Sequence, residues 1–131
     1  MVRALVRLPL GVPISNEPKF PAGVSNPQAY ETSGIINVQY ADPEDECWVH
    51  TRVYYVQGQD YIPNDIEKEC YLMFESSSKN QYKEKKYTID GNLLIMNYWS
   101  YYTVIFVTYS KDGFDKNNIQ FCSFKRSNEI I

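Results

Sequence analysis

A single histidine limits the acid–base chemistry that this sequence could perform. His50 is the only imidazole among 131 residues, so a Ser-His-Asp or Cys-His hydrolase would have to use it. The sequence lacks the G-x-S-x-G segment that exposes a nucleophilic serine, and no cysteine stands in a recognisable catalytic frame. We therefore predict that the chain is not an enzyme and that it has no catalytic residue.

Metal and thiol chemistry are limited by spacing. Cys47, Cys70 and Cys122 are too far apart in the sequence for a zinc knuckle or a C-x-x-C redox pair. One disulfide with one remaining thiol would fit a secreted protein, and three reduced thiols would fit a cytosolic one. Four carboxylates gather in one turn, at Asp42, Glu44, Asp45 and Glu46. A solvated turn is the expected role, with weak calcium binding as the alternative, so we predict no metal site and no cofactor.

Aromatic side chains are the better candidates for binding. The chain has twelve tyrosines and two tryptophans, whose flat apolar faces and hydrogen-bonding tips suit both pockets and cores. The candidate ligand-binding residues are Tyr40, Trp48, Tyr54, Tyr71, Met73, Tyr98, Trp99 and Tyr101. We expect Trp99 or Tyr101 to point into the interior and contact a ligand there, while a plain aromatic core is the alternative.

Apolar residues that alternate with polar ones predict the strands that must position these side chains. The segment GIINVQY places Ile36, Val38 and Tyr40 on one face, and the segments 47–56, 70–76, 81–89 and 119–126 also favour strands. The residues of 93–110 are largely aromatic or β-branched, which favours two strands bent near residue 99 over one buried helix. The only helix expected is short and lies within residues 62–70.

Two turn signals organise the rest of the chain. Asp90–Gly91 predicts a two-residue hairpin between residues 81–89 and the strand that follows. Five of the seven prolines lie in residues 1–29, which predicts an extended N-terminal arm, and residues 30–131 form the second predicted domain. The expected fold is all-β: an antiparallel meander of about seven to eight strands that closes, or nearly closes, into a small barrel.

One segment resembles a motif of the lipocalin-like (calycin) family. Residues 96–101 read MNYWSY before YTVIF, which is similar to the family's T-D-Y-x-x-Y motif at a bend between two late strands. Arg126 stands where the family's last barrel strand ends in an arginine, and the resemblance spans about residues 34–127. It implies an extracellular carrier with a ligand in its barrel and a disulfide from Cys122 to Cys47 or Cys70. The family's Gly-x-Trp motif and its C-terminal helix are absent.

Two functions follow from these patterns. The first is a secreted, non-catalytic carrier that binds a small apolar or aromatic ligand inside the barrel. The alternative is a protein-interaction factor or complex subunit with a filled core, using the N-terminal arm and the strand containing Lys83–Lys86 as contact surfaces. The net charge of −3 argues against nucleic-acid binding. The sequence contains no run of about 18 uncharged apolar residues, so we expect no membrane span.

Overall fold

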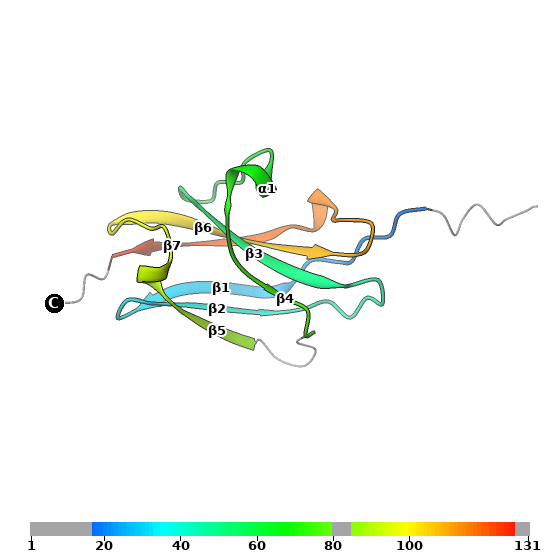
Figure 1. The fold of residues 1–131 in the computed structure, drawn as a ribbon, viewed down its shortest axis with the longest axis horizontal. Helices are drawn as coiled ribbons and strands as arrows, with labels where there is room; N and C mark the ends of the chain where they lie inside the picture. The colour runs from blue at the N-terminus through cyan, green and yellow to red at the C-terminus, as the bar shows by residue number, and fades with distance from the viewer. Residues whose placement is uncertain (1–16, 80–84, 128–131) are drawn as a thin grey trace, which may run out of the picture.

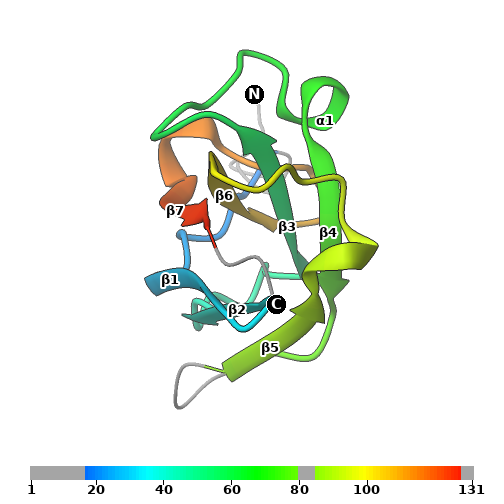
Figure 2. The same cartoon turned by 90° about the vertical axis from the view of Figure 1, so that its left-hand side faces the viewer.

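The protein folds into two antiparallel sheets that lie one above the other (Figures 1 and 2). The structure is a computed structural model, and it describes residues 17–79 and 85–127. The three-stranded sheet has the order β1-β2-β5, with β1 at Ser25–Thr32, β2 at Ile35–Ala41 and β5 at Lys85–Asp90. The four-stranded sheet has the order β4-β3-β6-β7, with β4 at Tyr71–Ser76, β3 at His50–Gln57, β6 at Ser100–Tyr109 and β7 at Gln120–Arg126.

The two sheets form a sandwich, so the predicted meander and barrel are wrong. Within the described residues, every strand pairing stays inside one sheet. The chain crosses from one sheet to the other after β2, after β4 and after β5. Period-two alternation shows that a strand has one buried face. It does not show whether that face packs against a second sheet or lines a barrel.

Side chains from both sheets fill the space between them. Val38 and Tyr40 of β2 and Val53 of β3 are fully buried, as the alternation of these segments predicts. The Tyr40 ring lies 5.3 Å from that of Phe106 and 5.8 Å from that of Tyr87. Aromatic rings at these separations pack well against one another, and they make the interior an aromatic core of the kind that the sequence left as an alternative.

The segment between β5 and β6 is not the strand that the Asp90–Gly91 pair predicts. Asp90 instead caps the 3₁₀ helix η3 (Gly91–Leu93), and its carboxylate accepts a hydrogen bond from Asn92 N at 2.9 Å. A Cβ at position 91 would lie 2.7 Å from the Arg126 guanidinium and 2.9 Å from Gly34 O. Glycine is therefore required at position 91, because the Arg126 guanidinium and the Gly34 carbonyl lie so close to the backbone. The predicted hairpin is absent, and β5 pairs with β2 instead.

Tyrosine hydroxyls fix this segment against the sandwich. Tyr102 Oη accepts a hydrogen bond from Asn97 N at 2.5 Å, and Tyr55 Oη accepts one from Ile95 N at 2.8 Å. Both rings are almost completely buried, so their hydroxyls provide partners for backbone donors that no strand satisfies. The segment between β5 and β6 is therefore fixed by these hydrogen bonds and not by pairing with a strand.

The N-terminal boundary and the helix complete the fold. β1 begins at Ser25, so the predicted division between residues 29 and 30 falls inside a strand, and residues 1–16 lie outside the described residues. The predicted short helix is confirmed as α1 (Ile66–Glu69), capped by Asp65, whose carboxylate accepts from Lys68 N. No helix among the described residues has the length and apolar character needed to cross a membrane.

A candidate binding face on the four-stranded sheet

The outer face of the four-stranded sheet has an apolar cluster of its own. It consists of Tyr54, Ile105, Val107 and Tyr109 of the sheet together with Ile66 of α1, and Phe114 and Ile119 of the β6–β7 connection pack against it. The hydroxyls of Tyr54 and Tyr109 lie 2.8 Å apart, and Tyr109 donates to Glu67 at 3.1 Å. Burial, then the contacts with Tyr54 and Glu67, raise the pKa of Tyr109, so it remains a neutral phenol.

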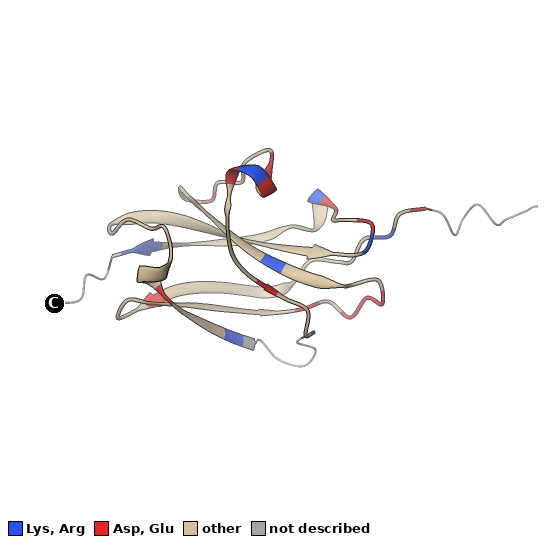
Figure 3. Cartoon of the chain, in the orientation of Figure 1, with Lys and Arg blue, Asp and Glu red and all other residues tan. Residues whose placement is uncertain are grey.

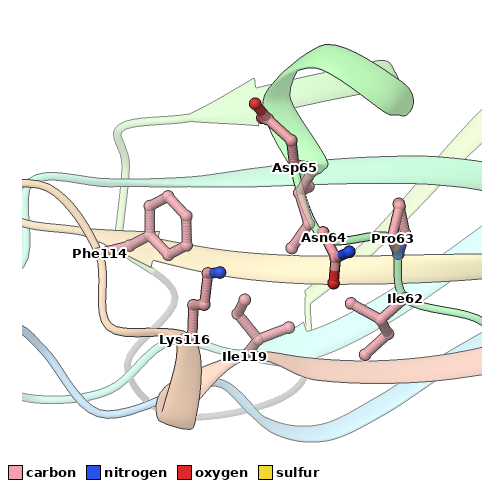
Figure 4. Close-up of a pocket in the computed structure, with 8 residues that line it drawn as sticks. Ile62, Pro63, Asn64, Asp65, Phe114, Lys116 and Ile119 are labelled. Carbon is pink, nitrogen blue, oxygen red and sulfur yellow. The ribbon is translucent and has the colours of Figure 1, made fainter.

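A groove opens beside this cluster (Figure 4). It has a volume of about 470 Å³ and is lined by Ile62, Pro63, Asn64, Asp65, Ile66, Phe114, Lys116 and Ile119. One wall precedes α1 and the other belongs to the β6–β7 connection, which contains the 3₁₀ helix η4 (Lys116–Asn118). Asp65 caps the first wall's helix, and Asp115 caps η4 by accepting from Asn117 N at 2.9 Å. Both walls are therefore held by their own local hydrogen bonds.

Exposed aromatic side chains extend from the groove along β7. We call them the β7 strip, which consists of Tyr61, Trp99, Tyr101, Phe121 and Lys125. The four aromatic residues are between 41% and 61% exposed, and Lys125 Nζ lies 6.0 Å from the Trp99 ring and 5.7 Å from the Tyr101 ring. Phe121 lies opposite Ile105 in the β6–β7 ladder. Because side chains alternate along a strand, Phe121 and Lys125 share the outer face.

The loop after β3 joins the strip to the groove. Asp60 accepts a hydrogen bond from Ser123 Oγ at 2.8 Å, and its own N–H donates back to that hydroxyl at the same distance. Tyr61 N donates to Thr103 Oγ1 at 2.9 Å. These bonds place the loop on β6 and β7. Tyr61 of the strip is therefore directly followed in the chain by Ile62 of the groove.

Trp99 has an unusual backbone conformation for a bulky residue. Its φ angle is +69°, in the left-handed region, while its side chain is 61% exposed. This conformation is costly for a residue with a Cβ, and such strain is found most often at functional positions. A hydrogen bond from Trp99 N to Arg126 O holds the backbone in place.

Charged residues of both signs lie along this part of the chain (Figure 3). Asp60, Asp65 and Asp115 each accept hydrogen bonds from the protein. Neither Lys116 nor Lys125 forms an ion pair with a described residue. Figure 4 shows Lys116 Nζ directed into the groove and the Asp65 carboxylate turned away from it. The groove therefore carries charges of both signs, with Asp65 and Lys116 in the same lining.

Most of the predicted ligand-binding residues are dispersed over the molecule. Tyr40 belongs to the core between the sheets and Tyr54 to the outer cluster, and burial is the main cause of a raised pKa at Tyr40. Trp48 donates to Thr51 Oγ1 at 2.9 Å. Met73 packs against the core, and Tyr71 stacks on Tyr55 with ring centres 5.4 Å apart. These five positions form no common pocket.

Only Tyr98, Trp99 and Tyr101 lie close together, and they are not inside the protein. The prediction that Trp99 or Tyr101 points into the interior is wrong, because both side chains face solvent. The Arg126 guanidinium lies 4.4 Å from the centre of the Tyr98 ring. Arg126 itself is buried and bonded to Glu31 at 3.1 Å, so the predicted terminal arginine has a structural role.

The other residues considered for chemistry also have structural surroundings. All three cysteines are free thiols, without the pairings that the lipocalin resemblance implied. Asp42 is buried and accepts from Thr51 Oγ1 at 2.6 Å, and Asp45 accepts from Ala22 N at 2.6 Å. Within residues 17–79 and 85–127, no three metal-ligating side chains are grouped together. His50 Nε2 lies 3.9 Å from the Glu75 carboxylate, and the His50 ring stacks on the Tyr109 ring.

Sequence reasoning missed every residue of the groove and three of the five residues of the β7 strip. Phe114, Ile119 and Phe121 were not candidates, since each lies in or beside a segment predicted as a loop or an ordinary strand. One signal was available: in IQFCSFKR, Ile119 and Phe121 alternate onto the face that also bears Lys125. Large apolar residues on the polar side of an edge strand indicate a surface that something covers.

Comparison with known proteins identifies the fold but no family. No protein-family model matches the chain, and no curated protein matches it. Among solved structures, it is similar to the third fibronectin III domain of the human KIAA0343 protein, with a TM-score of 0.52 and 13% identity. That match covers 87% of this chain and 89% of the other. At this identity the likeness establishes a fibronectin III-like β-sandwich fold and nothing about function.

The fold corrects the lipocalin assignment, and one tyrosine beside the motif has a role typical of sandwiches. Sandwiches of this broad architecture contain a tyrosine corner, in which a tyrosine near the start of a late strand bonds to the backbone a few residues upstream. Tyr102, bonded to Asn97 N, has that geometry. Tyr102 directly follows the segment 96–101 that gave the lipocalin resemblance. Domains with a fibronectin III-like fold are typically non-catalytic.

Proposed function

We propose that this protein is a non-catalytic protein-interaction module that binds a partner protein through the β7 strip and the adjoining groove. The observation that supports this most is the concentration of exposed aromatic side chains on one face, next to a formed groove. Large apolar patches on soluble proteins mark interaction sites. Tryptophan, tyrosine and arginine are also the residues that contribute most to binding energy at interfaces.

The local framework of the face supports binding without large rearrangement. The two walls of the groove are capped by Asp65 and Asp115, and the loop at Asp60 is bonded to β7. A preformed surface loses little conformational freedom on association, which leaves more of the contact energy for affinity. The filled core between the sheets favours this function over the carrier that the barrel would have provided.

Site-specific photo-crosslinking tests the proposal. Benzoylphenylalanine placed at Tyr101, on the strip, should give a discrete crosslinked product in extracts of the cells from which the protein comes. The control is the same group at Tyr30, which is 38% exposed on β1 of the other sheet. Products of equal yield from both positions, or none from Tyr101, would contradict the proposal.

A charge substitution in the strip provides the second readout. Phe121→Glu should abolish the product formed from Tyr101, because it places a carboxylate in the centre of an apolar contact surface. Phe121 is 41% exposed, so the substitution should leave the thermal unfolding temperature nearly unchanged. A persistent product in the folded variant would place the interface elsewhere.

A further inference from the structure

We infer that the partner's footprint extends beyond the β7 strip along residues 93–99, and that the partner meets this segment with an apolar, uncharged surface. The inference rests on the proposed function, because it names further contact residues and the chemistry of the same partner. It depends on the exposure of the segment, on its charge and on the way in which it is held.

The segment between η3 and β6 exposes alternate side chains. The exposed residues, which we call the 93–99 ridge, are Leu93, Ile95, Asn97 and Trp99. Leu93 is 79% exposed and Ile95 is 64% exposed, the highest values among the large apolar side chains that the structure describes. The intervening Leu94 and Met96 pack against the core between the sheets. They anchor the segment, whereas neither Leu93 nor Ile95 belongs to an apolar cluster of the described residues.

The backbone of the ridge is bonded to the sandwich. Ile95 N donates to Tyr55 Oη at 2.8 Å, and Asn97 N donates to the Tyr102 hydroxyl. Both tyrosines are buried, so the exposed side chains project from a segment that is already fixed. Such a surface loses little conformational freedom when a partner binds. Large apolar side chains exposed together on it indicate a surface that another molecule covers.

The strip by itself is small for a stable interface. Its four aromatic residues are between 41% and 61% exposed, and at about 200 Å² for each whole side chain they offer about 400 Å² to a partner. A stable protein–protein interface buries about 800 Å² on each side. The ridge continues the strip, because Trp99 belongs to both, and it crosses from one sheet to the other at the end of the sandwich (Figure 2).

The absence of charge along the ridge indicates the chemistry of the partner. Residues 91–110 contain no charged side chain, so a charged group of the partner would lose its water there without gaining a counter-charge. Lys125 lies beside Trp99, at the end of the ridge that adjoins the strip. The lack of lysine and arginine in residues 91–110 also argues against a membrane surface, where basic residues contact anionic head groups.

Photo-crosslinking from a second position tests the inference. Benzoylphenylalanine at Ile95 should give a product with the same partner chain as the product from Tyr101, identified by mass spectrometry. Leu93→Glu should lower the yield of the Tyr101 product at least about tenfold, because it places a carboxylate in an apolar contact. Leu93 is 79% exposed, so the thermal unfolding temperature should stay nearly unchanged.

Val49→Glu is the matched control. Val49 is 47% exposed, and its N–H donates to Tyr109 O, at the other end of β6 from the ridge. The same change of charge there should leave the yield of the Tyr101 product within about twofold of its original value. Equal losses from Leu93→Glu and Val49→Glu would reduce the effect to net charge and overturn the inference.

Salt and vesicles separate the possible occupants. The yield of the Ile95 product should stay within about twofold between about 50 mM and about 500 mM salt, because salt does not screen apolar contacts. A fall of about tenfold or more would assign a charged partner surface and overturn the inference. Vesicles of phosphatidylcholine and phosphatidylserine should not bind the protein. Vesicle binding that Leu93→Glu abolishes, or an Ile95 product that joins two copies of this chain, would also overturn it.

The two proposals fail in distinguishable ways. A Tyr101 product that persists in folded Leu93→Glu protein would keep the β7 strip as an interface and remove the ridge. A product from Ile95 with none from Tyr101 would remove the proposed function at the strip and leave the ridge as a contact surface of its own.

Discussion

The two outer faces of the sandwich are built on opposite principles. On the three-stranded sheet, Asn37 lies on the opposite face from Ile36 and Val38. Its side chain is only 4% exposed, and its amide donates to Tyr30 O, Thr32 Oγ1 and Ile35 O. On the four-stranded sheet, the outward positions of β6 are Ile105, Val107 and Tyr109, and α1 and the β6–β7 connection cover them. The outer face of the first sheet is mainly polar, whereas the central strand β6 of the second is buried on both sides from Tyr102 to Tyr109.

This difference shows that connections can extend a core beyond the space between the sheets. β6 is buried from Tyr102 to Tyr109 without interruption, which is the pattern of a strand covered on both faces. The cover that α1 and the β6–β7 connection form over β6 ends at the groove, where Ile62, Phe114 and Ile119 remain accessible. The candidate binding face is therefore the uncovered margin of a second apolar layer.

The largest effect should come from deleting apolar volume beneath the cover. Ile105→Ala should lower the free energy of unfolding by about 2–5 kcal/mol, because Ile105 is fully buried and its removal leaves a cavity. Gln39→Ala, on the exterior of β2, should change it by less than about 0.5 kcal/mol. Urea unfolding of both variants measures the contrast, and similar losses would remove the distinction between the faces.

A smaller effect should come from the hydrogen bonds of the cover. Tyr109→Phe removes the hydroxyl bonded to Tyr54 and Glu67 and should cost about 1 kcal/mol. Tyr30→Phe deletes a hydroxyl from a side chain that is 38% exposed and should cost less than about 0.5 kcal/mol. Chemical denaturation compares the two, and an equal cost would mean that the buried pair contributes no net stability.

The thiols of Cys70, at the end of α1, and Cys122, in β7, should make stability depend on alkaline pH. Burial raises the pKa of Cys70 to about 11 and that of Cys122 to about 12, from an ordinary value of 9.0. The folded protein therefore keeps protons that the unfolded chain releases above pH 9. The free energy of unfolding should consequently fall as the pH rises from about 9 towards 12.

The check is urea unfolding at about pH 8 and about pH 10.5 for the wild type and for Cys122→Ala. Tyr40 and Tyr109 also have raised pKa values through burial, so only the difference between the two proteins reports the thiol. The loss of stability with pH should be smaller in the variant. An identical loss would show that Cys122 does not contribute.

The smallest effect on stability should come from the strip itself. Trp99→Ala should change the free energy of unfolding by less than about 0.5 kcal/mol, because the ring lies on the surface. Trp99→Gly should raise it by up to about 1 kcal/mol, since glycine adopts the φ of +69° without strain. Thermal unfolding measures both variants. A loss of several kcal/mol for Trp99→Ala would place the ring in the core.

Local patterns predicted the strands better than their partners. The inward faces of β2 and β3, with Val38 and Val53 in the core, follow from alternation. In β4 the alternation fails at a bulge opposite Val53 and Tyr54, and Leu72 is exposed while Phe74 packs inward. A bulge depends on pairing with a neighbouring strand, which a single segment does not encode.

The candidate site was harder to predict because it depends on covering. Trp99 and Tyr101 were identified as important aromatic residues, but their alternation did not distinguish an interior from an exposed exterior. The groove at Phe114 and Ile119 arises where two loops distant in sequence approach each other. Propensity and periodicity describe single elements, and such a juxtaposition follows only from the order of strands in the sheet.

The buried pair of Arg126 and Glu31 has a consequence for how the chain is made. The two residues are 95 positions apart, and their side chains are 1% and 3% exposed. Synthesis at roughly 5–20 residues per second leaves Glu31 without its arginine for about 5 to 20 s after it is made. During that interval β1 is a nascent strand whose carboxylate lacks the guanidinium that accompanies it into the interior. The final closure of the sandwich is thereby delayed until β7 has been synthesised.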